Sequence, residues 1–315
     1  MKVLRDIDEL PSGLRFALAI GTFDGVHRGH VRVVSALTRA AAQLDAVPVV
    51  LTFDPHPAAV LRGEPPQLLC DPNERLELLE HLGVQITVVQ PFDTAFADQP
   101  GETFLARLTN GRELRGLVLT AESAFGRDRS AGLNTARELA RRFGYRVIEV
   151  PHLARDGAVV SSSRLRSVLA EGSLGDVQRL LGRRYAVVGT VVEGDQRGRA
   201  LGYPTANLSF DRAVALPKDG VYAVRVAWDA LDPPNERQRR PGVASLGVRP
   251  TFGGGGARIL EVNVFDFSGD LYGTHMRVEF VRRLRGEKRF TSSVALIGQM
   301  DRDAARARQV LEPLP

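Results

Sequence analysis

Two histidines, His27 and His30, lie three residues apart and follow the glycine-spaced segment 21–25. At the start of a helix this spacing places both imidazoles on one face. Free backbone N–H groups and the positive end of the helix dipole bind anions at such a position. Imidazolium donors there would stabilise the charge that develops on a triphosphate. Two surface histidines near a turn are the structural alternative.

Two further segments add polar groups suited to phosphate. Residues 52–57 read Thr-Phe-Asp-Pro-His-Pro, so two prolines fix the backbone around His56. In residues 160–166, Ser162 and Ser163 precede a helical pattern that carries Arg166. Hydroxyls and an arginine at a helix start can clamp a phosphate, although serine is also an ordinary N-cap.

A different set of polar residues lies in the second half of the chain. Thr205 and Asn207 place a hydroxyl and an amide oxygen two residues apart, so both face one side of an extended chain. Oxygen ligands of this kind suit Mg²⁺. The preceding glycine-spaced loop lacks the Gly-Lys-Ser/Thr ending of a Walker loop. In this loop, residues 194–203, we expect Gly198, Arg199 and Gly202 to approach phosphate.

Residues 1–182 alternate short apolar runs with helical patterns. The expected strands are 16–20, 47–53, 86–89, 116–119 and 145–150, and the expected helices are 30–44, 74–82, 103–108, 135–143 and 163–181. This alternation predicts an α/β domain, a Rossmann-like parallel sheet with helices on both faces. Ligands of such sheets bind beyond the carboxyl ends of the strands.

Residues 183–315 show a different pattern, with short β-type runs separated by loops rich in glycine and proline. The expected strands are 186–192, 220–228, 242–246, 260–265 and 276–280, with a polar hairpin loop at 231–241. Their spacing predicts a small antiparallel barrel or sandwich, followed by a terminal helix over 294–311. The length of 315 residues also favours two domains, 1–182 and 183–315.

Composition narrows the class of protein. The chain is 43% hydrophobic and 25% charged, as in ordinary globular proteins. Cys70 is the single cysteine, which excludes an intramolecular disulfide, argues against a cysteine-based zinc site and fits a cytoplasmic protein. The charged N-terminus does not resemble a signal peptide, and no apolar run is long enough to span a bilayer.

The formal net charge of +5 divides into −1 over residues 1–182 and +6 over residues 183–315. A positive second half suits phosphate-rich ligands. Because the basic residues are dispersed and no nucleic-acid-binding motif is present, we expect no nucleic-acid partner. We also expect no membrane partner, and the sequence leaves a weak homo-oligomer open.

Together these segments resemble a known family. The three N-terminal segments resemble, in order, the adenylyltransferase domain of bacterial bifunctional riboflavin kinase/FAD synthetases. The Gly-Arg-x-Leu-Gly-x-Pro-Thr-Ala-Asn segment resembles their kinase domain, as do four later segments: 242–252, 260–263, 270–273 and 284–290. The resemblance covers nearly the whole chain. It implies that ATP phosphorylates riboflavin to FMN and that a second ATP adenylylates FMN to FAD, with Mg²⁺ as the cofactor.

The resemblance also implies residue roles. Thr205 and Asn207 would hold the Mg²⁺ of MgATP, Glu261 would be the general base of the kinase, and Arg285 would contact the flavin. His27 and His30 would act in adenylyl transfer. The other nucleotide contacts that it implies in the first domain are Gly21, Phe23, Asp24, Gly29, His56, Ser162, Ser163 and Arg166.

One segment departs from the family pattern of Gly-x-Asp/Asn-Phe-x-Phe-Gly. Residues 120–126 read Thr-Ala-Glu-Ser-Ala-Phe-Gly, so Glu122 stands where a shorter residue is usual and Ser123 replaces an aromatic ring. Glu122 and Phe125 are still the expected flavin contacts. The departure leaves open a riboflavin kinase whose N-terminal domain adenylylates weakly or not at all. A non-catalytic flavin- or nucleic-acid-binding regulator is the third hypothesis.

Overall fold

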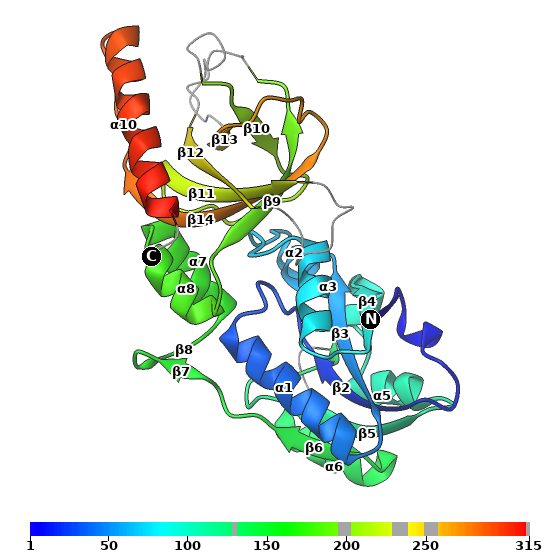
Figure 1. Ribbon diagram of the computed structural model, residues 1–315. Coiled ribbons are helices and arrows are strands. Elements are labelled where there is room, and N and C mark those ends of the chain that lie inside the picture. The colour runs from blue at the N-terminus through cyan, green and yellow to red at the C-terminus, as the bar shows by residue number, and fades with distance from the viewer. Residues whose placement is uncertain (128–130, 195–202, 229–238, 249–257, 313–315) are drawn as a thin grey trace. The chain divides into compact units, whose positions relative to one another are not determined.

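The chain folds into two compact units, Met1–Ser162 and Ser163–Pro315 (Figure 1). The structure is a computed structural model that describes residues 1–127, 131–194, 203–228, 239–248 and 258–312. Within these residues, no helix is both long and apolar enough to cross a membrane.

The first unit contains a six-stranded parallel sheet with the strand order β1-β4-β3-β2-β5-β6. The strands are β1 (Lys2–Leu4), β2 (Arg15–Ile20), β3 (Val47–Asp54), β4 (Ile86–Pro91), β5 (Glu113–Leu119) and β6 (Arg146–Glu149). The predicted parallel sheet is confirmed. Because all the strands are parallel, the loops that follow β2, β3, β4 and β5 leave the same edge of the sheet.

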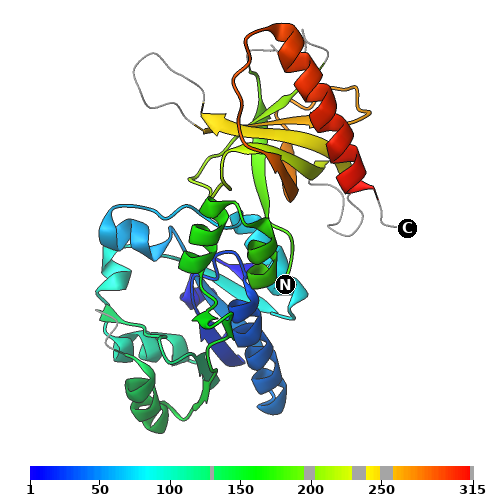
Figure 2. The same cartoon turned by 90° about the vertical axis from the view of Figure 1, so that its left-hand side faces the viewer.

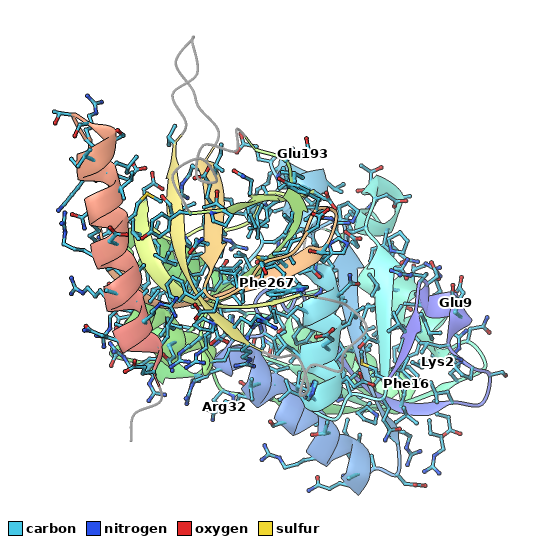
Figure 3. All side chains as sticks on the ribbon, turned by 45° about the horizontal axis from the view of Figure 1, so that its top comes forward. Lys2, Glu9, Phe16, Arg32, Glu193 and Phe267 are labelled. Atoms are coloured by element: carbon cyan, nitrogen blue, oxygen red, sulfur yellow. The ribbon has the colours of Figure 1, made fainter. Side chains whose placement is uncertain are left out.

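Helices cover both faces of this sheet. Successive residues of β2 point to opposite faces. Phe16, labelled in Figure 3, and Leu18 join one buried cluster with α5 (Gly101–Thr109) and α6 (Leu133–Phe143). Ala17 and Ala19 join the other cluster, with α1 (Arg28–Gln43) and α3 (Pro72–His81). The shorter elements are η1 (Ile7–Glu9), α2 (Pro57–Arg62), α4 (Thr94–Ala97), β7 (Ala154–Arg155) and β8 (Ala158–Val159).

The single helix expected over 163–181 is two helices, α7 (Ser162–Glu171) and α8 (Leu174–Leu181). Gly172 separates them with a left-handed φ of 85°, which favours glycine. Residues 163–182, which the sequence pattern places in the first domain, belong to the second compact unit. There α8 packs against strand β14 (His275–Arg285).

The second unit is a closed antiparallel barrel with the strand order β10-β13-β12-β11-β14-β9. Its other strands are β9 (Ala186–Val192), β10 (Ala206–Ser209), β11 (Gly220–Trp228), β12 (Arg240–Val248) and β13 (Arg258–Val264). The barrel confirms one of the two predicted architectures. Strand β10 was expected only as an extended segment, because its four residues are too few to show a β pattern.

The terminal helix α10 (Ser293–Leu311) lies along the outside of the barrel (Figure 2). Ala307 and Leu311 of this helix form a buried cluster with Val221 and Ala223 of β11 and Leu284 of β14. One part of the outer barrel surface is therefore covered by α10, and polar residues elsewhere on this surface form the site described below.

Candidate active sites

In the first unit, the loop after β2 is held firmly against neighbouring segments. The Gly25 N–H donates to Cys70 Sγ at 3.2 Å. Gly25 has a left-handed φ of 78°, and a Cβ there would lie 2.9 Å from the Cβ of Leu69. Only glycine satisfies both the backbone conformation and the close approach. The loop is thus fixed where it leads into α1.

His27 is the N-cap of α1, and its Nδ1 accepts the N–H of His30 at 3.2 Å. In the neutral ring the proton therefore lies on Nε2, which is the donor nitrogen of this ring. The two rings stack with centroids 3.6 Å apart. A Cβ on Gly29 would lie 3.0 Å from the His27 ring, so glycine leaves room for this ring. The two rings lie on one face, as their spacing predicts, and their role in catalysis stays a prediction.

The protonation state of His30 differs from the expected imidazolium. Burial, and secondarily the proximity of His27, hold the pKa of His30 well below its ordinary value of 6.5. His30 is therefore neutral near pH 7. Its ring centroid lies 5.2 Å from that of Phe23, and its buried Nδ1 has no hydrogen-bond partner among the described residues.

His56 repeats the arrangement of His27 after the neighbouring strand. It is the N-cap of α2, and its Nδ1 accepts the N–H of Ala58 at 3.1 Å. Its Nε2 therefore carries the proton of the neutral ring and is also a donor. Strands β2 and β3 are parallel neighbours, so His27 and His56 follow their carboxyl ends at one edge of the sheet. Two imidazole N–H donors there suit an anionic ligand.

In the second unit, strand pairing brings three polar residues into one row. Asn207 of β10 is paired with Glu261 of β13, which is paired on its other side with Ser245 of β12. Directly opposed residues have Cβ atoms about 5 Å apart on the same face. Leu260 and Val262 are fully buried on either side of Glu261. The row of polar residues therefore lies on the outer face of the barrel.

Asn207 is tightly confined in this row. Its side chain lies against the backbone of Gly194, where a Cβ would be 2.2 Å from Asn207 Nδ2. The chain before Thr205 is fixed because Asn263 Nδ2 donates to the Pro204 carbonyl at 2.8 Å. Thr205 and Asn207 offer a hydroxyl and an amide oxygen beside a carboxylate, a donor set that fits Mg²⁺. Residues Gly198, Arg199 and Gly202 lie outside the described part of the chain.

Comparisons with known proteins match both halves of the chain. Residues 12–164 match the family model described as FAD synthetase, and residues 181–311 match the model described as riboflavin kinase. The bifunctional riboflavin kinase/FMN adenylyltransferase of Haemophilus influenzae is 34% identical over 93% of this chain and 93% of its own length. The protein of the same name from Escherichia coli K12 is 33% identical over 98% of this chain and 97% of its own.

This chain belongs to the bifunctional riboflavin kinase/FMN adenylyltransferase family. A similar solved structure, described as a macrolide-efflux protein from Streptococcus pneumoniae, is 30% identical and has a TM-score of 0.83. It covers 97% of this chain and 98% of its own. That name describes the other protein, and the family assignment rests on the two domain models and the full-length relatives.

Asp24 and Ser162, which the family resemblance places at the nucleotide, make hydrogen bonds that hold the loop after β2. Asp24 is 2% exposed, and its carboxylate accepts the N–H of Leu69 at 2.9 Å. The Asp24 carbonyl accepts the Ser162 hydroxyl at 3.0 Å. Both contacts hold the loop that carries the histidines. Ser163 and Arg166 lie on α7 in the second unit, and their contact with nucleotide stays a prediction.

The two expected flavin contacts of the first unit differ in exposure. The Glu122 side chain is 77% exposed, and its Oε1 lies 3.7 Å from His152 Nε2. Phe125 is 8% exposed, and its ring lies 5.7 Å from that of Phe104 within the hydrophobic core. Phe125 therefore anchors residues 120–126 in the hydrophobic core, whereas the Glu122 side chain is accessible to solvent. Their contact with flavin stays a prediction.

Arg285 lies at the far end of the same barrel row, because Val221 pairs with both Ser245 and Arg285. Its guanidinium is bound to the buried carboxylate of Asp303 on α10, with Nη2 2.7 Å and Nε 2.9 Å from Oδ2. This pair fastens the helix to β14. These bonds occupy one side of the guanidinium. The contact of Arg285 with flavin stays a prediction.

A cavity of about 570 Å³ lies beside this row, between the end of β13 and α10. Its lining includes Tyr203, Asn263, Phe265, Asp301 and Arg308. The Tyr203 hydroxyl donates to Asp301, and this hydrogen bond together with burial raises the pKa of Tyr203 to about 12. The cavity shares Asn263 with the strand that carries Glu261.

Sequence reasoning missed the contacts of Arg75, Gly194 and Asp303. Arg75 contacts a loop 53 positions earlier in the chain, so no local pattern could have identified it. Asp303 looks like any polar residue of an amphipathic helix, yet it is 6% exposed. Gly194 begins the glycine-spaced loop, and that spacing was the one available signal.

Proposed function

We propose that the barrel unit makes FMN from riboflavin and ATP, and that the edge of the parallel sheet makes FAD from FMN and a second ATP. The observation that carries this proposal is the presence of two separate polar sites in one chain. One is the Asn207–Glu261–Ser245 row of the barrel. The other is the loop whose N-cap histidine, His27, stacks on His30.

For the kinase step, we assign Glu261 as the general base. Its carboxylate takes the proton of the riboflavin 5′-hydroxyl, whose oxygen then attacks the γ-phosphorus of ATP while ADP leaves. Thr205 and Asn207 would hold Mg²⁺, which when bound neutralises the charge of the phosphates. Because phosphoryl transfer depends mainly on positioning, the pairing of Asn207 with Glu261 on adjacent strands is the important feature.

For the adenylyl-transfer step, the FMN phosphate attacks the α-phosphorus of ATP, and pyrophosphate leaves. No protein nucleophile is needed, because the attacking phosphate is already ionised. The Nε2–H groups of His27 and His56 donate to the phosphate oxygens on which negative charge develops. Neutral His30 packs between Phe23 and His27 and keeps the His27 ring in place.

The remaining assignments follow from these two sites. We place the functional domain boundary at 182/183. The riboflavin kinase model begins two residues earlier, at residue 181, and the compact units divide between Ser162 and Ser163. The substrates are riboflavin, FMN and ATP, and Mg²⁺ is the metal cofactor. A cytoplasmic location fits the single cysteine, Cys70, which is buried and reduced.

The proposal is tested by incubating the protein with riboflavin, ATP and Mg²⁺ and separating the flavins by chromatography. We expect FMN to appear first and FAD to follow. FMN without FAD would favour the riboflavin kinase with an inactive adenylyltransferase domain, an alternative that the family comparisons do not support. Unchanged riboflavin would contradict both assignments and favour a non-catalytic flavin-binding protein.

A further inference from the structure

Arg75 is a buried cation beneath the loop that follows β2. It lies in the first turns of α3 and is 8% exposed. Among the described residues, no carboxylate pairs with Arg75, and its buried Nε has no hydrogen-bond partner. Burying a guanidinium charge without a countercharge is costly. A nearby anion would offset this cost.

Among the described residues, the guanidinium makes one hydrogen bond, and its acceptor lies in the loop. Arg75 Nη1 donates to the Thr22 carbonyl at 3.1 Å, and the fully buried Thr52 hydroxyl donates to the same oxygen at 3.1 Å. A trans peptide is planar, so the Phe23 N–H points to the opposite side from this carbonyl. Among the described residues that N–H has no partner, and it remains a donor for a ligand.

We propose that Arg75 is a positioning residue of the adenylyl-transfer site. Arg75 fixes the Thr22–Phe23 peptide, so that the Phe23 N–H faces the ligand, and it supplies positive charge beneath the loop that binds the triphosphate of ATP. Such a charge is held in place before the substrate arrives and acts through a medium of low dielectric constant. This inference rests on the proposed role of the loop in ATP binding.

Charge separates this role from a merely structural one. A purely structural contact with the Thr22 carbonyl needs only a hydrogen-bond donor, and the Thr52 hydroxyl already supplies one. Three substitutions separate the two contributions. Arg75→Lys keeps the charge, Arg75→Gln keeps a donor without charge, and Arg75→Met keeps neither. The riboflavin kinase activity of the same chain reports whether each variant is folded.

We expect Arg75→Gln to raise the KM for ATP in adenylyl transfer about tenfold, since charge-assisted hydrogen bonds are roughly twice as strong as neutral ones. Arg75→Met should raise it further, and Arg75→Lys should restore most of the affinity. The KM for FMN and the kinase activity should stay near wild type. Because the chain has two proposed ATP sites, calorimetric titration with ATP should show one affinity that follows this order and a second, that of the kinase site, that does not change.

Two results would overturn the inference: an Arg75→Gln variant that binds ATP like wild type, or an equal rise in the KM for FMN. If Arg75→Met also loses kinase activity, that variant is misfolded. The test then rests on comparing the KM for ATP of Arg75→Gln with that of Arg75→Lys, because both variants keep a long polar side chain. His30→Ala is measured in parallel. If His30→Ala loses adenylyl transfer but Arg75→Gln binds ATP normally, the role of Arg75 is rejected and the assignment of the site stands. Normal adenylyl transfer in His30→Ala rejects the site itself.

Discussion

Replacing Gly194 with alanine should disable the kinase through a single methyl group. The new Cβ would lie 2.2 Å from Nδ2, 2.6 Å from Cγ and 2.8 Å from Oδ1 of Asn207, against 3.4–4 Å for ordinary contact. The amide must therefore move by roughly 1 Å. It has little room, because Asn207 is 9% exposed and is paired with Val192 on one side and Glu261 on the other.

A misplacement of about 1 Å in a catalytic group can cost ~10²-fold in rate. We therefore expect Gly194→Ala to lower kcat/KM for riboflavin phosphorylation about 100-fold, measured by the rate of FMN formation. Adenylylation of supplied FMN should be unchanged, because the histidine loop of that site lies in the other unit.

The matched control is Gly175→Ala, in α8 of the same unit. Among the described residues, apart from its chain neighbours and its own helix backbone, the one heavy atom within 4 Å of its would-be Cβ is the flexible end of Arg179, at 4.0 Å. Alanine also favours a helix. This control should keep both activities. A folded Gly194→Ala protein with kinase activity within about threefold of wild type, or ~0.7 kcal/mol, would refute the assignment of Asn207 to the site.

Three other perturbations have expected outcomes. Gly29→Ala should lower adenylyl transfer and spare the kinase, because the new Cβ would lie 3.0 Å from the His27 ring; steady-state rates of both reactions would show it. The pKa of His30 is lowered by burial, so the unfolded chain takes up this proton first, and stability should fall as pH drops below 6.5. Urea unfolding of the first unit at several pH values should show this slope, and His30→Phe should flatten it. Asp303→Asn leaves Arg285 without its carboxylate and should destabilise the barrel by about 3 kcal/mol, read as a lower urea midpoint.

A specific result would contradict each of these three predictions. Equal loss of both activities in Gly29→Ala would indicate general misfolding rather than displacement of a ring. The exposed His81 serves as the control for the pH experiment, and an equally flattened slope in His81→Gln would reject the role of His30. An unchanged urea midpoint in Asp303→Asn would mean that the ion pair contributes nothing to the barrel.

The sequence predicts much of the first unit because its signals are local. Strand β2, the turn at Gly25 and the start of α1 were all expected, since apolar runs, glycine and helix periodicity lie within a few residues of one another. The break at Gly172 was missed because the apolar positions on both sides of it fit one helix. The protonation of His30 was also missed, since burial depends on how distant segments pack.

The second unit shows the same limit. Asn207 and Glu261 were both identified, but their placement on adjacent strands depends on the barrel register. Arg285 was expected to contact flavin, and the structure adds a partner, Asp303, 18 positions later in the chain. Contacts between elements are set by the tertiary fold, and no spacing within one element reveals them.

The central claim is that two separate sites on this chain perform the two steps, and two substitutions test it most directly. In one experiment, Glu261→Gln and His30→Ala are each assayed for FMN formation from riboflavin and for FAD formation from supplied FMN. We predict that Glu261→Gln loses the first activity and keeps the second, and that His30→Ala does the reverse. Loss of both activities in either folded variant would contradict the account.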